Sequence, residues 1–484
     1  MKIKTGLLFL LFFSLAVTCF LGPIGCANIV APQGGPKDTI PPYLVSAVPK
    51  DSARKFTGKK IIFNFNEYID GRDIRNELMV SPVPKIDPII EAKLRTVTVR
   101  IKDTLEENTT YALFFGKGIR DNNEGNVLPN FTYVFSTGDT IDRGEYSGTV
   151  LIANTGRPDS TLVAMLHTKL DDSAVVKERP RYIAKCDSLG RFHFRFLKPG
   201  NYALYAMKDE GGSHKYLSKA QLFAYADSPI IVGSEARPLT LYAYAEGQDT
   251  VKPSGTTTAG FGKPAATAPR RGVSKENDRR LQVTTNAQGN VVDVLDTFRL
   301  MFSSGLKIFD STQLRFTDDG YQDIDARKYH YERDTTGKVV TLYYPWPTDT
   351  KFHLILPRTF GQDSLGRKLS KDDTINFRTK KDIDYGEIRI RVGNLDPSKH
   401  PVLQFVAGDK IKYTLPFNAR REVRQLLFAP GDYELRLLYD VNRNMIWDHG
   451  VFFGKNKRQP ERVITLMKKF TVKPNWDNDK DITL

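Results

Sequence analysis

One stretch of this chain occurs twice, and it constrains the fold more than any other feature. Residues 196–209 and residues 427–440 both place a Pro-Gly pair before an alternating apolar run that ends in Asp. Proline presets φ at the first corner of a turn and glycine supplies the positive φ of the second, so each copy predicts a turn leading into a strand. Pro199 and Pro430 lie 231 residues apart (430 − 199). We infer that a large unit was duplicated.

The remainder of the chain favours strands. Phe, Tyr, Val, Ile and Thr recur in short alternating runs bounded by Gly, Pro, Asn and Asp. Outside the N-terminus, no long stretch repeats apolar residues at helical spacing. With 484 residues, 40% of them hydrophobic, the chain is too long for one ordinary core. We therefore predict an all-β protein built from tandem β-sandwich domains.

The N-terminus carries the features of an export signal. Two lysines precede an apolar run over residues 7–21, which is about five residues shorter than a membrane-spanning helix needs. Gly25 followed by Cys26 resembles the cleavage and acylation motif of bacterial lipoproteins, although Pro23 stands where leucine is usual. We expect cleavage of the signal and lipid on Cys26. Plain cleavage and an uncleaved anchor are the alternatives.

Cysteine usage agrees with export without a disulfide. Cys19 lies inside the predicted signal, Cys26 would carry the lipid, and Cys186 is the last of the three cysteines. A lone thiol cannot form an internal disulfide, so core packing must hold the domains together. We expect Cys186 to be a small buried side chain and not a nucleophile, because no His and Asp accompany it at an informative spacing.

The first region after the N-terminus reads as a β-sandwich, because apolar and polar residues alternate in short runs separated by turn clusters. Four segments resemble a bacterial Ig-like domain of the surface-layer type. They are 41–51 (PPYLVSAVPKD), 61–69 (IIFNFNEYI), 108–113 (NTTYAL) and 121–138, from DNNEGN to FSTG. Such domains are generally spacers or interaction modules, which is what the resemblance implies here.

A second kind of β unit comes next. Residues 187–204 (DSLGRFHFRFLKPGNYAL) look like the prealbumin-like, carboxypeptidase-regulatory type of module. The resemblance implies a β-sandwich without catalytic residues. Phe192, Phe194 and Phe196 are expected to enter its core, while the polar residues between them face water.

The same order of domains repeats after a break in composition. Residues 246–280 are rich in Gly, Thr, Ser, Pro and Ala, with Phe261 as their one aromatic residue, which predicts a flexible linker. Beyond it, Asp363-Ser-Leu-Gly corresponds to Asp121-Asn-Asn-Glu-Gly, and residues 297–302 correspond to the strand around Ile61. We predict a duplicated pair of domains. The predicted segments are a signal helix (1–25), a tether (26–40), an Ig-like domain (41–140), a prealbumin-like domain (141–245), the linker (246–280), a degenerate Ig-like domain (281–381) and a second prealbumin-like domain (382–484).

The best candidate for chemistry comes directly after the second copy of the repeated strand. Side-chain oxygens recur at alternate positions there, as in the first part of a calcium loop. A complete EF-hand is excluded, because Met445 replaces the required Gly and Val451 replaces the bidentate Glu. A shorter calcium site and an Asx-rich hairpin turn both remain open. The candidate calcium ligands are Asp440, Asn442, Asn444, Ile446 and Asp448.

Enzymatic motifs are missing from the sequence. The seven histidines form no H-E-x-x-H or other zinc spacing, and there is no G-x-S-x-G nucleophile elbow. We therefore predict a non-enzymatic protein with a structural or adhesive task. One alternative is a carbohydrate-binding accessory protein, with Trp346, Trp447 or Trp476 stacking on sugars, although core packing explains each tryptophan as well. The other alternative is a hydrolase with an unrecognised pair of carboxylates.

The predicted export signal and the net charge together indicate which partners to expect. Without residues 1–25 the net charge is +13 (+15 − 2). Such a surplus can attract anionic headgroups or acidic polysaccharide, but the basic residues are widely spread, so nucleic-acid binding is not expected. We expect a bacterial envelope protein held by its N-terminal lipid, at the outer membrane, with envelope proteins or acidic polysaccharide as partners.

Overall fold

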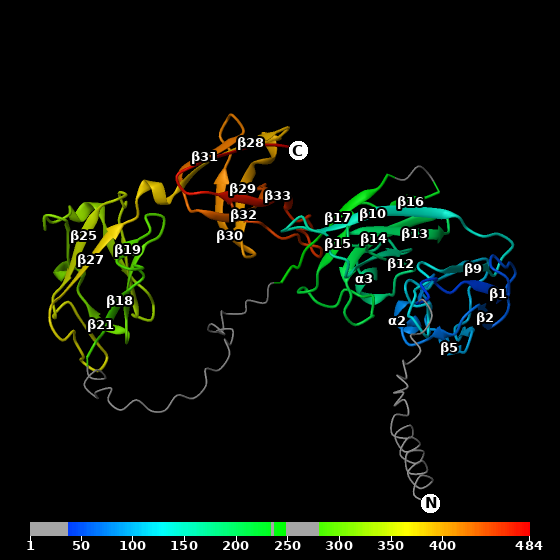
Figure 1. Cartoon of the computed structure of the whole chain (residues 1–484). Coiled ribbons are helices and arrows are strands. Elements are labelled where there is room, and N and C mark those ends of the chain that lie inside the picture. Colours follow the sequence, from blue (N-terminus) through cyan, green and yellow to red (C-terminus); the bar gives the residue numbers. More distant parts are fainter. Residues whose placement is uncertain (1–36, 234–236, 248–279) are drawn as a thin grey trace, which may run out of the picture. The chain divides into compact units, whose positions relative to one another are not determined.

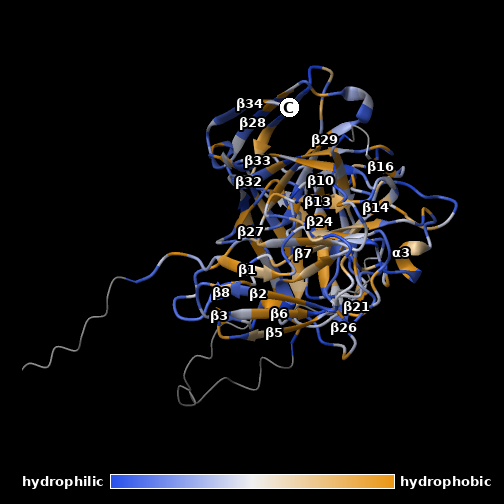
Figure 2. Ribbon diagram, turned by 90° about the vertical axis from the view of Figure 1, so that its right-hand side faces the viewer, coloured by the Kyte–Doolittle hydropathy of each residue, from blue (hydrophilic) through white to orange (hydrophobic). Residues whose placement is uncertain are grey.

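The protein is described by a computed structural model over residues 37–233, 237–247 and 280–484 (Figure 1). Strands make up most of the secondary structure, and hydrophobic residues concentrate on them while connecting loops are hydrophilic (Figure 2). This confirms the predicted all-β class with tandem β-sandwich domains. The predicted signal, Cys26, most of the tether and most of the linker lie outside the described residues. None of the helices in the described ranges is long and apolar enough to cross a membrane.

The chain divides into two compact units, Met1–Val80 with Pro84–Ile141, and Ser81–Val83 with Asp142–Leu484. The first unit is a sandwich whose core includes Ile61, Phe63 and Val97. These alternate residues face inward because successive strand residues point to opposite faces. Its sheets have the orders β1-β2-β6-β5, β4-β7-β9 and β3-β8. The elements are β1 (Leu44–Val48), β2 (Lys60–Phe65), β3 (Ile69–Asp70), α2 (Ile74–Glu77), β4 (Met79–Ser81), β5 (Ile89–Lys93), β6 (Thr96–Arg100), β7 (Thr110–Phe114), β8 (Arg120–Asp121) and β9 (Thr132–Ser136).

The region after the linker repeats this strand order. Its sheets are β18-β20-β24-β23, β19-β27-β25-β22 and β21-β26, so residues 303–336, which have little sequence likeness to the first copy, still supply the equivalent strands. Buried Phe298, Phe316 and Phe377 belong to its core. The strands are β18 (Val283–Thr285), β19 (Val291–Val292), β20 (Phe298–Phe302), β21 (Leu306–Phe309), β22 (Arg315–Asp318), β23 (His330–Arg333), β24 (Val339–Tyr343), β25 (Lys351–Leu356), β26 (Gly361–Asp363) and β27 (Asp373–Thr379), with short 3₁₀ helices η2 (Ser311–Gln313) and η3 (Ala326–Lys328).

A buried Asp marks the same turn in both copies. Asp121 accepts backbone N–H bonds from Asn123, Glu124, Gly125 and Asn126. Asp363 accepts the N–H groups of residues 365 and 367 together with the Arg367 guanidinium. Burial alone would raise the pKa of each carboxyl, but these donors, together with the Ser304 hydroxyl on Asp363 (2.7 Å), outweigh burial and hold both pKa values below the usual range. The correspondence noticed in the sequence is therefore a shared turn architecture.

The two regions predicted to be prealbumin-like also share one topology. We call residues 144–246 the first module and residues 386–484 the second module. The first has sheets β13-β10-β17 and β12-β11-β14-β15, with β16 also on β14. Its elements are β10 (Gly144–Ile152), β11 (Leu162–His167), α3 (Ala174–Lys177), β12 (Tyr182–Lys185), β13 (Arg191–Leu197), β14 (Gly200–Lys208), β15 (Phe223–Tyr225), β16 (Ile230–Val232) and β17 (Leu239–Ala243).

The second module has sheets β31-β28-β34 and β30-β29-β32-β33. In both modules the opening strand pairs in parallel with the closing strand: β10 with β17, and β28 with β34. A short 3₁₀ helix, η4 (Asp382–Asp384), precedes the second module. Its elements are β28 (Gly386–Gly393), η5 (Pro397–Lys399), β29 (Pro401–Ala407), β30 (Lys410–Pro416), β31 (Glu422–Phe428), β32 (Gly431–Tyr439), β33 (Arg462–Val472) and β34 (Asp477–Thr483).

The repeated stretch forms the central strand of each module, β14 and β32. The two strands have identical burial patterns, and Tyr202 and Tyr433 each donate a hydroxyl bond to the backbone carbonyl four residues upstream. The positive φ expected of the glycine after each proline is confirmed: Gly200 and Gly431 have φ of 157° and 154°. Each glycine also begins its strand and pairs with a neighbouring strand.

The expectation for the three phenylalanines of β13 is partly wrong. Phe192 and Phe194 are buried, but Leu197 takes the next core position instead of Phe196. The pairing of β13 with β10 shifts register between Gly144 and Tyr146, and Phe196 has a φ of +59°. A bulge of this kind inserts an extra residue and reverses the facing of the residues beyond it. The β28–β31 pair shifts register at the corresponding place.

The two modules are in contact within the second unit. Val463 donates a backbone bond to the Ala153 carbonyl (3.0 Å), Thr465 donates its hydroxyl to the Thr155 carbonyl (3.0 Å), and Arg157 pairs with buried Glu434. The loop between β32 and β33 also reaches the first module. Its Phe452 is 0% exposed and belongs to an aromatic cluster with Tyr205, Phe223 and Tyr225. The β14 sheet is consequently covered on both faces, by the core of its own module and by this cluster.

Candidate functional site

The predicted calcium loop lies between β32 and β33, and we call residues 440–448 the acidic loop. Asp440 is 1% exposed, and its carboxylate accepts the backbone N–H groups of Asn444 (3.1 Å) and Met445 (2.6 Å). The side-chain amides of Asn442 and Asn444 both donate to Oδ2 of Asp448, at 2.6 and 2.9 Å. The structure therefore brings four of the five predicted ligands together. Their own hydrogen bonds close the loop in the manner of linked Asx turns.

The fifth predicted ligand, Ile446, is bonded to the others through its backbone. Its N–H donates to Oδ1 of Asn444 (2.7 Å), and its side chain is exposed. Among the residues the structure describes, no three His, Cys, Asp or Glu side chains lie close enough to hold a metal ion. An oxygen-rich loop remains compatible with a hard cation through amide and carbonyl ligands. The calcium assignment remains a prediction.

Glu461 is a buried residue outside the acidic loop that holds the loop in place, and the sequence did not predict it. Its two carboxylate oxygens accept the N–H groups of Val441 (2.8 Å) and Asp448 (3.0 Å), which fastens both ends of the acidic loop to the start of β33. Burial raises the pKa of Glu461, and the nearby Asp440 and Asp448 carboxylates raise it further. No spacing signal could have revealed it, because Glu461 lies 13 residues beyond Asp448.

The first module has only a remnant of the acidic loop. Asp209 follows β14 as Asp440 follows β32, and it accepts backbone bonds from Ser213 (3.2 Å) and His214 (2.9 Å). The other positions lack the amide side chains of the second copy. The capping role of the Asp is thus common to both modules. Of these positions, the first copy keeps a side-chain oxygen at Ser213, whose hydroxyl accepts the Lys215 N–H (3.3 Å).

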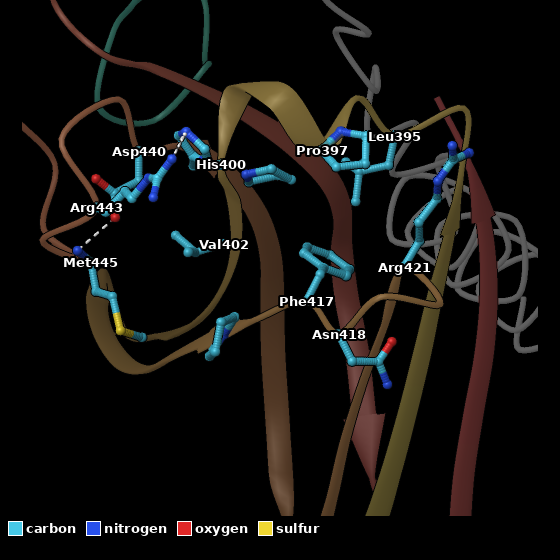
Figure 3. Close-up of a pocket in the computed structure, with 12 residues that line it drawn as sticks. Leu395, Pro397, His400, Val402, Phe417, Asn418, Arg421, Asp440, Arg443 and Met445 are labelled. Carbon is cyan, nitrogen blue, oxygen red and sulfur yellow. Dashed lines mark hydrogen bonds between the residues drawn. The ribbon is translucent and has the colours of Figure 1, made fainter.

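A cavity of about 410 Å³ opens beside the acidic loop (Figure 3). Buried Leu395 and Val402 and half-buried Phe417 supply apolar surface. Arg421 and Arg443 lie on opposite sides of the lining in Figure 3, with the Arg443 guanidinium directed at His400 and the Arg421 guanidinium directed outward. Neither guanidinium forms an ion pair with any residue of the described ranges. The cavity is therefore apolar in its walls and positively charged at its rim.

The backbone around this cavity is unusual. His400, Arg421, Arg443 and Met445 line it and have φ values of +47°, +59°, +64° and +62°. Residues other than glycine rarely adopt this left-handed backbone conformation, because it costs free energy. Such residues are enriched at functional sites. Arg443 also donates to Nε2 of His400 (2.9 Å). Since a guanidinium only donates, that ring nitrogen is the acceptor of the bond.

The three tryptophans proposed for sugar stacking occupy different environments. Trp346 packs edge-to-face within the core cluster of Phe298, Phe316 and Phe352. Trp447 is half-buried, and its indole N–H donates to the Glu461 carbonyl (2.8 Å). Trp476 is 61% exposed, with the Lys473 ammonium 4.7 Å from its ring centroid. Of the three, Trp476 presents the most surface to solvent.

The cysteines add no reactive group to the described structure. Cys26, the predicted lipid site, lies outside the described residues. Cys186 is a free, buried thiol, and burial raises its pKa to about 12. A thiol that stays protonated at neutral pH is a poor nucleophile, as expected from the sequence.

Comparisons with known proteins identify one part of the chain. No curated protein matches the sequence. Three of the similar solved structures are an alpha-2-macroglobulin fragment from Escherichia coli (domains MG0-NIE-MG1; 12% identity, 39% of this chain and 71% of that chain, TM-score 0.19), the N-terminal part of the bacterial S-layer protein SbsC (16%, 42% and 44%, 0.16) and BcpA, the major pilin subunit of Bacillus cereus (11%, 71% and 99%, 0.16). Likenesses this weak carry no argument about function. Residues 38–137, in contrast, match the family described as bacterial Ig-like domain, so the first unit is a bacterial Ig-like domain.

Proposed function

We propose that this protein is a non-enzymatic, lipid-anchored protein of the bacterial cell envelope that acts as a structural or adhesive scaffold. The observation that carries the proposal is the bacterial Ig-like domain at residues 38–137, followed by three further strand-built regions. Arrays of such domains hold binding surfaces at a distance from an anchor. The lipid on Cys26 would supply that anchor, at the outer membrane.

Three of the buried acidic groups support a non-enzymatic role, and another, Glu461, has a raised pKa but both of its oxygens are bonded to loop N–H groups. Asp121, Asp363 and Glu434 each serve as acceptors for loop N–H groups or arginine. A general acid or base needs access to a substrate and a pKa near the working pH. In Asp121, Asp363 and Glu434 the pKa is lowered instead, which keeps these groups charged and bonded.

Lipid attachment is tested by expressing the full chain in a bacterial host with a radiolabelled fatty acid. The proposal expects label on the protein and partition into the detergent phase of Triton X-114. Cys26→Ser should abolish both, whereas Cys19→Ser, inside the predicted signal, should leave both unchanged. Unlabelled protein that stays in the aqueous phase would refute the anchor. The scaffold role is tested separately, by crosslinking in intact cells followed by identification of envelope partners.

A carbohydrate-binding role is the second candidate, favoured by the exposure of Trp476 and by the ammonium beside its ring. An indole face with a neighbouring cation suits an acidic sugar, because the ring stacks on the pyranose while the cation pairs with the carboxylate. Pull-down with acidic polysaccharide should weaken in Trp476→Ala and persist in Trp346→Phe. Equal retention of both variants would argue against this role.

A further inference from the structure

One surface turn occurs twice in this protein, in two regions of different topology. Residues 187–191 of the first module and residues 363–367 of the region after the linker both have the sequence Asp-Ser-Leu-Gly-Arg. In each copy the Asp carboxylate accepts the backbone N–H of the Leu (2.8 and 2.9 Å) and of the Arg (2.9 Å in both), and the Arg Nε donates to its second oxygen (2.8 and 2.7 Å). Gly190 and Gly366 have φ of +75° and +72°. The two turns therefore share one structure.

The serine and leucine side chains are not needed to form this turn. The bonds that close it use the Asp and Arg side chains and the backbone. Ser188 and Ser364 are exposed, and neither hydroxyl has a hydrogen-bond partner in the part of the chain that the structure describes. Leu189 is 57% exposed and Leu365 is 75% exposed. Folding therefore does not account for the Ser-Leu pair that both turns present at the surface.

A third turn of this protein shows that other residues can fill these positions. Asp334 accepts the Val339 N–H (2.9 Å), and Gly337 has a φ of +67°. Its Thr336 hydroxyl donates to Oδ2 of Asp334 (2.5 Å), and residues 334–338 include no leucine. Of these three turns, the two identical ones present an unbonded hydroxyl next to an exposed leucine. This is the arrangement expected of a short sequence that another protein recognises.

We propose that Ser188 and Ser364 are O-glycosylation sites, each modified by a transferase that recognises the exposed Ser-Leu pair. The co-substrate is a sugar activated as a nucleotide or lipid diphosphate. The serine Oγ attacks the anomeric carbon, and the new C–O bond replaces the bond between the sugar and the diphosphate, which leaves. The serine proton passes to a base of the transferase. This modification goes beyond the proposed scaffold role and does not depend on it.

A sugar suits these positions better than a phosphate, the other common modification of serine. The Arg191 backbone N–H and guanidinium hold the pKa of Asp187 below its usual value, so the carboxylate next to Ser188 stays ionised. A phosphate adds a charge of about −1.5 to −2 and is repelled by a neighbouring Asp. A sugar is uncharged and soluble, and its C–H groups can cover the exposed side chain of Leu189.

Mass spectrometry of the full chain, purified from the envelope of the bacterium that encodes it, tests the proposal. Peptides that contain Ser188 and Ser364 should carry the mass of one or more sugar residues. Ser188→Ala and Ser364→Ala should each remove the sugar from their own peptide and leave the other peptide modified. Ser398 is the matched control, because it is exposed but its hydroxyl donates to Asp396 (2.6 Å), and its peptide should be unmodified.

Two further variants test whether the leucine is recognised. Leu189→Asn and Leu365→Asn keep the Asp, Gly and Arg that form the turn, so they should fold normally and lose the sugar from the neighbouring serine. Unmodified Ser188 and Ser364 peptides, a phosphate in place of the sugar, equal modification of Ser398, or full modification in the leucine variants would each overturn the proposal. Lipid labelling of Cys26 is measured separately, so failure of the anchor and failure of glycosylation are distinguishable.

Discussion

Replacing Phe452 by alanine should uncouple the two modules. The ring is 0% exposed, and its centroid lies 4.8 Å from that of Phe223 and 4.9 Å from that of Tyr225. Its backbone N–H donates to Glu246 of the first module at 2.7 Å, a bond that alanine preserves. The substitution therefore removes the ring alone. Deleting a fully buried Phe costs about 3–5 kcal/mol, which weakens the contact by roughly two to four powers of ten.

Hydrogen–deuterium exchange of the full chain measures this effect. Backbone amides that lie beneath Phe452 in β14 and β15 should exchange faster in Phe452→Ala, while amides of β2 and β6 in the first unit stay protected. Phe453→Ala is the matched control, because Phe453 is 38% exposed and should cost under about 1.5 kcal/mol. Unchanged exchange in β14 and β15 would refute the inference that Phe452 joins the modules. Equal effects of both variants would also refute it.

Three further predictions concern acidic groups: buried Asp363, buried Glu434 and the acidic loop. Asp363→Asn should destabilise its domain by about 2 kcal/mol through weakened bonds to Arg367 and the loop. The pKa of Asp363 is lowered by folding, so this stabilisation is present above pH 3.8 and is lost as the pH falls through the lower folded value. Urea titrations from pH 7 to pH 2 should therefore show that the unfolding free energy depends less steeply on pH in the variant than in the natural protein. Glu434→Gln should cost about 3 kcal/mol at pH 7, because it leaves the buried Arg436 guanidinium without its charged partner, whereas the exposed Asp409→Asn should change denaturant stability by under about 0.5 kcal/mol. If the acidic loop binds calcium, millimolar Ca²⁺ but not Mg²⁺ should raise Tm by a few degrees (about 2.7 kcal/mol at 100 Kd), and Asp448→Asn should abolish the shift; identical melting curves would leave the loop as an Asx-rich turn.

Features set by local pattern were predictable. The alternation in β2 and β13 placed Phe63, Phe192 and Phe194 correctly in cores, because side-chain facing along a strand depends only on neighbours in sequence. The correspondence of Asp121 with Asp363 was also visible, since both turns need an acceptor at the same place. The all-β fold and its repeated order depended on such local signals.

Features set by distant partners were not predictable. The bulge that buries Leu197 in place of Phe196 arises from pairing with β10, some fifty residues upstream. Glu461 joins the acidic loop and Phe452 reaches the first module only because β33 pairs back onto β32. The cavity likewise gathers Leu395, Phe417 and Met445 from separate loops. When an apolar residue lies in a turn, the neighbouring sequence does not indicate which distant residue will pack against it.

The parallel pairing of β10 with β17 has a mechanical consequence. Tension along the backbone enters the first module at Gly144 and leaves it at Ala243, at opposite ends of two side-by-side strands. Pulling slides one strand along the other, so the pairs from Gly148–Leu239 to Ile152–Ala243 bear the load together instead of opening one after another. The same holds for β28 and β34, where seven residue pairs share it. Each module is thereby built to resist stretching, which suits the scaffold role proposed above.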